Sequence, residues 1–254
     1  MRKVIILNGS PRKGNTRRQL ERLQAVLGAS ERGIDSEIID IGRLDIKACR
    51  GCENCLRNGS CLIDDDAAAV FRKIAAADGL IAGTPVYLKQ ISGSLKNLID
   101  RGCSWYHRSP VTGKPFFALA TTQATGAKQT AAYLRDLAVQ WGMIPAGSLQ
   151  NTGFNLKKEI NPLILKNFIR YLEPGSKRSF SPPLGQIIEY NNQKLVAMHV
   201  LDLDRKYWTE QGWNDSPFYF RCRMNPVWRI IGGIYFRIGS RFIGKSAGQR
   251  MKEG

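Results

Sequence analysis

Four cysteines between positions 49 and 61 are the part of the sequence with the clearest chemistry. They follow the spacing C-x2-C-x2-C-x5-C and are Cys49, Cys52, Cys55 and Cys61. Four thiolates on one short loop, residues 47–62, can wrap a cubane iron–sulfur cluster, and Gly51 and Gly59 permit the tight turns. Tetrahedral zinc is an alternative, although zinc sites usually use two separated C-x2-C pairs. Thiols without a metal and a redox-active disulfide are the remaining alternatives.

A second candidate site is the loop of residues 9–16, GSPRKGNT, between an apolar run and a helical pattern. Backbone N–H groups at a helix start favour anions. The polar side chains that could join them are Ser10, Arg12, Asn15 and Thr16. Asn15 stands where the nucleotide P-loop requires lysine, and the dinucleotide pattern G-x-G-x-x-G is absent. We therefore expect a site for a single terminal phosphate; the alternative is a polar turn capped by Asn15 or Thr16.

Other reactive residue types are given structural roles. Asp64, Asp65 and Asp66 are interpreted as the N-terminal cap of a helix rather than as a metal site. His107 and His199 are the only histidines, and both are expected to be solvated or packed. Cys103 and Cys222 are isolated in the sequence and are interpreted as structural or free thiols. No Ser-His-Asp or Cys-His set is evident.

The first 150 residues alternate between strand-like and helix-like segments, which predicts a parallel sheet with helices on both faces. The expected strands are 3–7, 36–41, 79–83, 115–120 and 143–149. The expected helices are 16–27, 64–77, 92–101 and 127–141. Ligands of such sheets bind at the carboxyl ends of the strands, so the loops after the first, third and fourth strands are the candidate site.

Residues 151–254 lose this alternation and are expected to form a helical and irregular extension. We predict a helix over 162–172 and a hairpin near Asn191 and Asn192. Residues 218–254 hold eight Arg or Lys and one Glu. A helix over 228–245 would separate an apolar face (Trp228, Ile231, Ile234, Tyr235, Ile238, Phe242) from a basic face (Arg229, Arg237, Arg241, Lys245). Its glycines, Gly232, Gly233, Gly239 and Gly244, weaken this prediction.

Composition narrows the class of protein. The hydrophobic fraction of 43% excludes a mostly disordered chain, and 38 Lys plus Arg against 21 Asp plus Glu give a net charge of +17. This excess points to anionic partners. For the basic helix we expect packing within the protein or across a dimer, with an acidic redox partner or an anionic membrane surface as alternatives and no nucleic acid. No signal-peptide core or membrane span is evident, so a cytoplasmic location with reduced thiols is expected.

The motifs together resemble the flavodoxin-like NAD(P)H-dependent FMN reductase superfamily and, within it, the iron–sulfur flavoproteins. The matching segments are VIILNGSPRKGNT, CRGCENC…C followed by DDD, ADGLIAGTPVY and SLKNLIDR, between residue 3 and about residue 150. The resemblance implies a doubly wound α/β fold with a five-stranded parallel sheet in the order 2-1-3-4-5. It also implies a dimer.

The resemblance further implies bound FMN. The FMN phosphate would lie against Ser10, Arg12, Asn15 and Thr16. The isoalloxazine ring would rest on Pro85, Val86 and Tyr87, and its other side would be closed by Thr121, Thr122, Gln123 and Gly126. By the same resemblance, Cys49, Cys52, Cys55 and Cys61 would hold a [4Fe–4S] cluster.

Three hypotheses for function follow. The first is an FMN-dependent oxidoreductase in which electrons pass between the flavin and the cluster, with a ferredoxin-like acidic protein as one candidate partner. The second is an FMN or quinone reductase that takes electrons from NAD(P)H and holds no cluster. The third, from another class, is a non-catalytic protein that binds through its basic tail. No catalytic side chain is needed in the first two, because flavin itself carries the redox chemistry.

Overall fold

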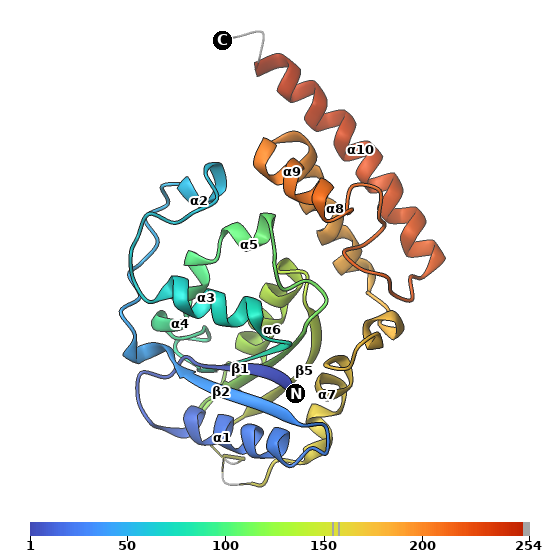
Figure 1. The fold of residues 1–254 in the computed structure, drawn as a ribbon. Helices are drawn as coiled ribbons and strands as arrows, with labels where there is room; N and C mark the ends of the chain where they lie inside the picture. Colours follow the sequence, from blue (N-terminus) through green and yellow to red (C-terminus); the bar gives the residue numbers. More distant parts are fainter. Residues whose placement is uncertain (154, 157, 251–254) are drawn as a thin grey trace.

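The computed structural model describes residues 1–153, 155, 156 and 158–250, and its centre is a parallel sheet. The five strands lie in the order β2-β1-β3-β4-β5, as predicted (Figure 1). They are β1 (Arg2–Asn8), β2 (Ile34–Asp40), β3 (Gly79–Pro85), β4 (Pro115–Thr121) and β5 (Ile144–Asn151). The predicted strand positions are confirmed, except that β2 gives way to a 3-10 turn, η1 (Ile41–Arg43), one residue early.

Helices cover both faces of the sheet (Figure 1). One face packs on α1 (Asn15–Gly28) and α7 (Lys166–Tyr171), the other on α3 (Ala67–Ala76), α4 (Gly93–Arg101) and α6 (Ala127–Gln140). The interior strand β1, between β2 and β3, packs on both sides: Val4 and Ile6 join the α1 side, while Ile5 and Leu7 join the α3 side. Such two-sided burial explains why β1 is a continuous apolar run in the sequence.

The strand order reverses between β1 and β3. The chain leaves β1 through α1 to reach β2 on one side, and it leaves β3 through α4 to reach β4 on the other. The loops that follow these neighbouring strands therefore diverge and leave a crevice at their carboxyl ends. Residues 9–14 and 86–92 form the walls of this crevice, and residues 122–126 after β4 lie next to them.

Beyond β5 the chain is helical. After η2 (Pro162–Leu165), α7 and η3 (Ser176–Ser179) it forms α8 (Leu184–His199), α9 (Asp202–Glu210) and α10 (Pro226–Arg250). The helix predicted over 162–172 is confirmed as η2 and α7. The predicted hairpin is wrong, because Asn191 and Asn192 lie inside α8. The Asn191 amide donates to the Ile187 carbonyl at 2.7 Å, one turn back, so this turn-favouring residue is satisfied within a helix.

The extension has an aromatic core of its own, in which Tyr190, Trp208, Trp213, Phe218 and Tyr219 pack together and against Ile144 at the start of β5. The Tyr190 hydroxyl lies 2.7 Å from the Trp213 carbonyl and 2.8 Å from the Ser216 carbonyl, which share its single proton. This packing fixes α8 and α9 on the sheet domain. Within the described part of the chain, none of the helices combines the length and apolar character needed to cross a bilayer.

Candidate functional site

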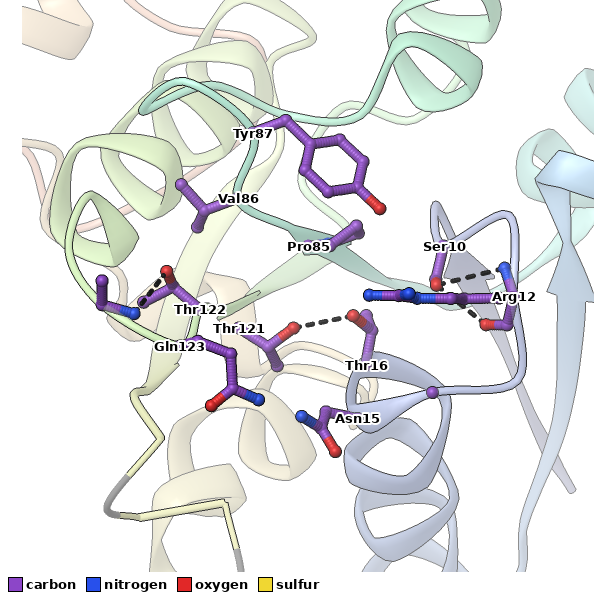
Figure 2. A pocket seen from close by; sticks show the side chains of 12 residues that line it. Ser10, Arg12, Asn15, Thr16, Pro85, Val86, Tyr87, Thr121, Thr122 and Gln123 are labelled. Carbon is purple, nitrogen blue, oxygen red and sulfur yellow. Dashed lines mark hydrogen bonds between the residues drawn. The ribbon is translucent and has the colours of Figure 1, made fainter.

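A cavity of about 530 Å³ opens at the carboxyl ends of β1, β3 and β4 (Figure 2). All but one of the predicted FMN-binding residues line it. The lining comprises Ser10, Arg12, Gly14, Asn15, Thr16, Pro85, Val86, Tyr87, Thr121, Thr122, Gln123 and Ala124. The exception is Gly126, which stands behind the wall: a Cβ placed on it would lie 3.0 Å from Val86 Cγ1. Gly126 therefore supports Val86 rather than facing the cavity, whereas Gly14 and Ala124 line the cavity without having been predicted.

The loop after β1 is folded on itself by local hydrogen bonds. The Ser10 backbone N–H donates to Asn8 Oδ1 at 3.1 Å, and the Ser10 hydroxyl donates to the Arg12 carbonyl at 2.8 Å (Figure 2). The Gly9 N–H donates to the Gly83 carbonyl at 2.8 Å, which ties this loop to β3. These bonds hold Ser10 and Arg12 at the start of α1, where the helix N-terminus adds positive potential.

A charged cluster supports the loop from behind. Asp40, at the end of β2, accepts from Asn8 Nδ2 and from Arg17, both at 2.7 Å. Burial alone would raise the pKa of the Asp40 carboxyl, but the hydrogen bonds from Asn8 and Arg17 outweigh it and hold that pKa below its usual value. Asp40 is therefore ionised at neutral pH, and it anchors the end of β1 against the first turn of α1.

A buried contact joins the two sides of the crevice. The hydroxyls of Thr16, in the first turn of α1, and Thr121, at the end of β4, lie 2.7 Å apart, and both side chains are buried (Figure 2). Two predicted residues that are more than a hundred positions apart in sequence thus meet at the floor of one cavity. The fold brings them together because β4 lies next to β3, and β3 next to β1.

The loop after β3 forms the mouth of the cavity. Tyr87 and Gln90 pair their backbones across a tight turn whose central residues, Leu88 and Lys89, have φ of 49° and 64°. A left-handed backbone at a branched residue such as Leu88 is rare and stores strain. Tyr87 is 44% exposed, and its ring stands over the cavity above Pro85 (Figure 2). The turn thus presents an aromatic face to whatever enters.

The cysteine loop lies apart from this cavity, above α3 and α5 (Ser104–His107), and carries a short helix, α2 (Asn54–Arg57) (Figure 1). Gly51 and Gly59 adopt positive φ, as the sequence predicted. All six cysteines are free thiols; Cys49, Cys52 and Cys61 are exposed and Cys55 is half-buried. Among the residues that the structure describes, no three Cys, His, Asp or Glu side chains converge on a metal position.

The thiols are nevertheless close enough to shift one another's pKa. Burial first, and then the charges of Cys103, Cys61 and Cys49, raise the pKa of the Cys55 thiol. Burial and the charge of Cys49 likewise raise the pKa of Cys103. Cys103 is a free thiol, one of the two alternatives predicted for it, and it lies near enough to the cysteine loop for the charge of Cys49 to act on it. Cys222 lies in the extension, where burial raises its pKa to about 11, as befits an inert thiol.

A buried arginine at the end of α4 closes the base of the cysteine loop. Arg101 donates to the carbonyls of Lys47 at 3.1 Å and Ile63 at 3.0 Å, and it forms an ion pair with Asp65. Burial raises the pKa of Asp65, but the bonds from Arg101 and from the amides of Lys47 and Ala67 outweigh it, so that the pKa is lowered. The two ends of the loop are thereby held together.

The three aspartates after the loop act differently from the prediction. α3 begins at Ala67, and the cap residue Asp66 makes no side-chain cap; its carboxylate accepts from the Asp45 amide at 2.9 Å instead. Asp65 accepts from the Ala67 amide at 3.0 Å, and this is the one capping bond that the prediction anticipated. The aspartates mainly fasten the end of the loop to residues 45–47, where the chain enters it.

A second arginine binds the middle of the loop and is itself held by the extension. Arg108 donates to the Cys55 carbonyl at 2.6 Å and pairs with Asp204 of α9. His107 Nδ1 donates to the other oxygen of Asp204 at 2.8 Å. Asp204 is completely buried, and burial together with the charge of Arg108 lowers the pKa of His107, which is therefore neutral at neutral pH. His107 has a packed role, as predicted.

Sequence reasoning missed Arg101, Arg108 and Asp204. For Asp204 a signal existed, because Trp208 follows it by four residues and the two share one helical face. A carboxylate in the buried stripe of an amphipathic helix indicates a buried ion pair, since an unpaired charge would not be tolerated there. The partners on the distant chain segment could not be read from the sequence.

Comparison with known proteins agrees with this geometry. The sequence pattern of the NADPH-dependent FMN reductases matches residues 2–153. The chain belongs to this family. An iron–sulfur flavoprotein of Archaeoglobus fulgidus is 27% identical over 220 residues, covering 83% of this chain and 99% of that protein. Another, from Methanocaldococcus jannaschii, is 41% identical over 100 residues, covering 39% of this chain and 51% of that protein. The chain is thus a member of the iron–sulfur flavoprotein subgroup of the NADPH-dependent FMN reductases.

Among solved structures, RosB with bound 8-demethyl-8-formylriboflavin-5′-phosphate shares the fold, with a TM-score of 0.55 at 15% identity over 89% of this chain and 92% of that one. The likeness reaches beyond residue 153, so it includes helices of the extension. This chain, a member of the FMN reductase family, is a flavin-dependent oxidoreductase with a flavodoxin-like sheet.

Proposed function

We propose that this oxidoreductase transfers electrons between FMN in the cavity at β1, β3 and β4 and a [4Fe–4S] cluster on Cys49, Cys52, Cys55 and Cys61. The observation that carries the proposal is the convergence of residues from three loops on one cavity of about 530 Å³. Bound FMN supplies both hydride and single-electron chemistry, and a cluster supplies single-electron chemistry. The chain's own residues bind, orient and enclose these groups.

The cavity fits FMN at its two ends. Ser10, Arg12, Asn15 and Thr16 place hydroxyl, amide and guanidinium groups around the N-terminus of α1, which suits a phosphate dianion. Pro85, Val86 and Tyr87 offer an apolar and aromatic wall for a flat ring. Thr121, Thr122 and Gln123 supply polar groups on the opposite wall. Gly126 acts indirectly, by leaving room for Val86.

The cysteine loop fits a cluster by the chemistry of its donors. Four thiols lie on one exposed segment that Arg101 closes at its base and Arg108 fastens at its middle. The charges of Cys49 and Cys61 both act on Cys55, so these thiols lie in one neighbourhood. Ligation would neutralise this repulsion, because cluster irons bind thiolates directly. The same four thiols would also suit zinc, and the measurement of iron described below distinguishes a cluster from a zinc site.

The first measurement is anaerobic purification with iron, sulfide and FMN quantified on one sample. The expected result is one FMN and about four irons and four sulfides per chain. In Cys52→Ser, iron should fall clearly below four per chain while FMN is retained, because one of the four thiolate ligands is removed. The control Cys222→Ser, a thiol of the extension, should keep both. FMN without iron in the wild type would instead favour an NAD(P)H-driven reductase.

Tyr87 provides a separate prediction for the flavin ring. Tyr87→Ala should weaken FMN binding by about tenfold, since an aromatic contact contributes about 1 kcal/mol beyond its area. Tyr87→Phe is the matched control and should bind FMN like the wild type. Fluorescence titration of the apoprotein with FMN measures both. Equal affinity in all three proteins would show that the ring lies elsewhere.

Several partner assignments stay predictions. They are NAD(P)H as electron donor, an acidic ferredoxin-like protein as redox partner, a homodimer and a cytoplasmic location. The exposed side chains of Tyr87 and Leu88 beside the cavity are consistent with a second chain covering its mouth. The net charge of +17 is consistent with an acidic partner. A non-catalytic role through the basic tail alone is not favoured, because it does not account for the cavity at β1, β3 and β4 and its polar lining.

A further inference from the structure

Helix α10 carries a row of exposed apolar side chains along one side. Val227, Ile230, Ile234, Ile238 and Phe242 recur at intervals of three or four residues, and each is at least half exposed. This row, called here the α10 ridge, is about 22 Å long at 1.5 Å per residue. Figure 1 shows α10 at the periphery of the molecule, with its far end projecting beyond α8 and α9.

The opposite side of α10 is used for packing on α8. A Cβ placed on Gly232 would lie 2.7 Å from Ile187 Cγ2, and one on Gly239 would lie 2.5 Å from Leu195 Cδ1. The two glycines are seven residues apart and therefore face the same way. Glycines that weakened the helix prediction are thus required by the close approach of the two helices. The single apolar face predicted from the sequence is divided, since Trp228 and Ile231 are half-buried while Ile234, Ile238 and Phe242 are exposed.

A cavity of about 500 Å³ adjoins the α10 ridge, between α8, α10 and residues 215–217. Ile230 and Ile234 line it and also belong to the ridge, so the two features are continuous. Its cations are Lys194, Arg229 and Arg237, and one carboxylate, that of Asp215, lies beside them. Lys194 Nζ stands 4.7 Å from the centre of the Phe236 ring, which keeps the amine at the cavity wall. The site therefore pairs an anion-attracting pocket with an apolar edge.

The charge around the ridge decides between occupants. Arg221, Arg223, Arg229, Arg237 and Arg241 are all exposed. A second copy docked along this ridge would bring two such sets together in a contact where like charges repel. An anionic lipid surface offers the opposite charge and takes the apolar row into its acyl region, which is how basic amphipathic helices bind membranes. We infer that α10 and its cation-lined cavity dock this protein on the surface of an anionic bilayer.

In this arrangement each part of the site has a task. The α10 ridge buries its apolar side chains at the level of the acyl boundary, and the helix lies in the plane of the surface. Arg229, Arg237 and Lys194 receive a lipid phosphate in the cavity at the ridge's edge. The interaction is additional to the redox chemistry and involves none of the residues of the flavin cavity or the cysteine loop.

Vesicle co-sedimentation tests the inference. The full chain is mixed with vesicles of phosphatidylcholine containing about 30% phosphatidylglycerol, and with pure phosphatidylcholine vesicles. Binding is expected to the anionic vesicles only, and to weaken by about tenfold or more between about 0.1 and 0.5 M salt. Ile234→Asn/Ile238→Asn should weaken binding at 0.1 M salt by about tenfold, because apolar immersion is lost. Arg229→Gln/Arg237→Gln should weaken it similarly.

The control is Leu163→Asn, which replaces an even more exposed apolar residue (70%, against 50% for Ile234 and Ile238) at η2, away from α10, and should bind as the wild type does. All variants should retain FMN, which confirms folding. The inference is overturned if the wild-type protein does not co-sediment with the anionic vesicles. It is also overturned when Ile234→Asn/Ile238→Asn binds them unchanged, since attraction then needs only net charge. Light scattering covers the remaining alternative. If the wild type does not bind vesicles and Ile234→Asn/Ile238→Asn has a lower molar mass than the wild type, the α10 ridge is a contact between copies of the chain.

Discussion

Asp204→Asn is expected to release the cysteine loop and to destabilise the whole chain. Asp204 is fully buried and accepts from Arg108 on one oxygen and His107 on the other. Its neutral replacement leaves the guanidinium of Arg108, itself only 10% exposed, without a counter-charge. Removal of one partner of a buried ion pair typically costs about 3–5 kcal/mol. The apparent melting midpoint should fall by about 6–20 °C for a chain of this size.

The loss of stability should depend on the burial of the aspartate, and neither on its place in α9 nor on the loss of one negative charge. Asp202 lies two residues earlier on the same helix, is 94% exposed and pairs with Arg205 at the surface. Asp202→Asn removes the same charge and should change stability by less than about 0.5 kcal/mol. Thermal melts of the two variants give the comparison. Equal midpoints would show that the pair with Arg108 does not hold the extension in place.

Arg108→Lys distinguishes the loss of cysteine-loop anchoring from a general loss of stability. A lysine can still face Asp204, but it lacks the planar fork that reaches the Cys55 carbonyl at the same time. We expect a drop of about 1 kcal/mol in stability. We also expect iron retention after anaerobic purification to fall as far as in Asp204→Asn. Retained iron in both variants would mean that the extension does not position the loop. Cys52→Ser tests the cluster itself, so the two failures are distinguishable.

Local sequence patterns are sufficient to predict most of the sheet domain. Alternating apolar segments indicate β1 to β5 and the helices α1, α3, α4 and α6 within a few residues, because each segment shows the burial pattern of its place in the sheet. The candidate site is equally predictable. Thr16 and Thr121 are distant in sequence, yet Thr121 ends β4 and Thr16 begins the helix after β1, at the same edge of a parallel sheet, so the fold class alone brings them together.

The extension is less predictable for physical reasons. Asn191 in α8 is buried and its amide is satisfied by a carbonyl one turn back, whereas its usual preference is for turns. Gly232 and Gly239 lower helix propensity, and only the presence of α8 makes their small size an advantage. Tertiary contacts override local preference in both places. The role of Gly126 in the site could not be predicted for the same reason, because it depends on contact with Val86, which belongs to another loop.

Asn15→Asp is expected to abolish tight FMN binding while leaving the fold intact. Asn15 is the first residue of α1, lines the cavity and accepts a hydrogen bond from Arg18. A carboxylate there retains that bond and is favoured by the helix dipole, so folding stability should be unchanged or slightly higher. The same carboxylate repels the phosphate dianion that we place beside it. The expected loss is about 100-fold in FMN affinity, equivalent to about 2.7 kcal/mol.

Two controls make this prediction a test of phosphate placement. Asn161→Asp adds an identical charge at the cap of η2, outside the cavity, and should leave FMN affinity unchanged. Riboflavin lacks the phosphate, so its weaker binding should be the same in wild type and in Asn15→Asp. Titration of the apoproteins with both flavins, followed by fluorescence, gives the four affinities. Equal losses for FMN and riboflavin would place the phosphate elsewhere, because charge repulsion at α1 acts only on the ligand that carries the dianion.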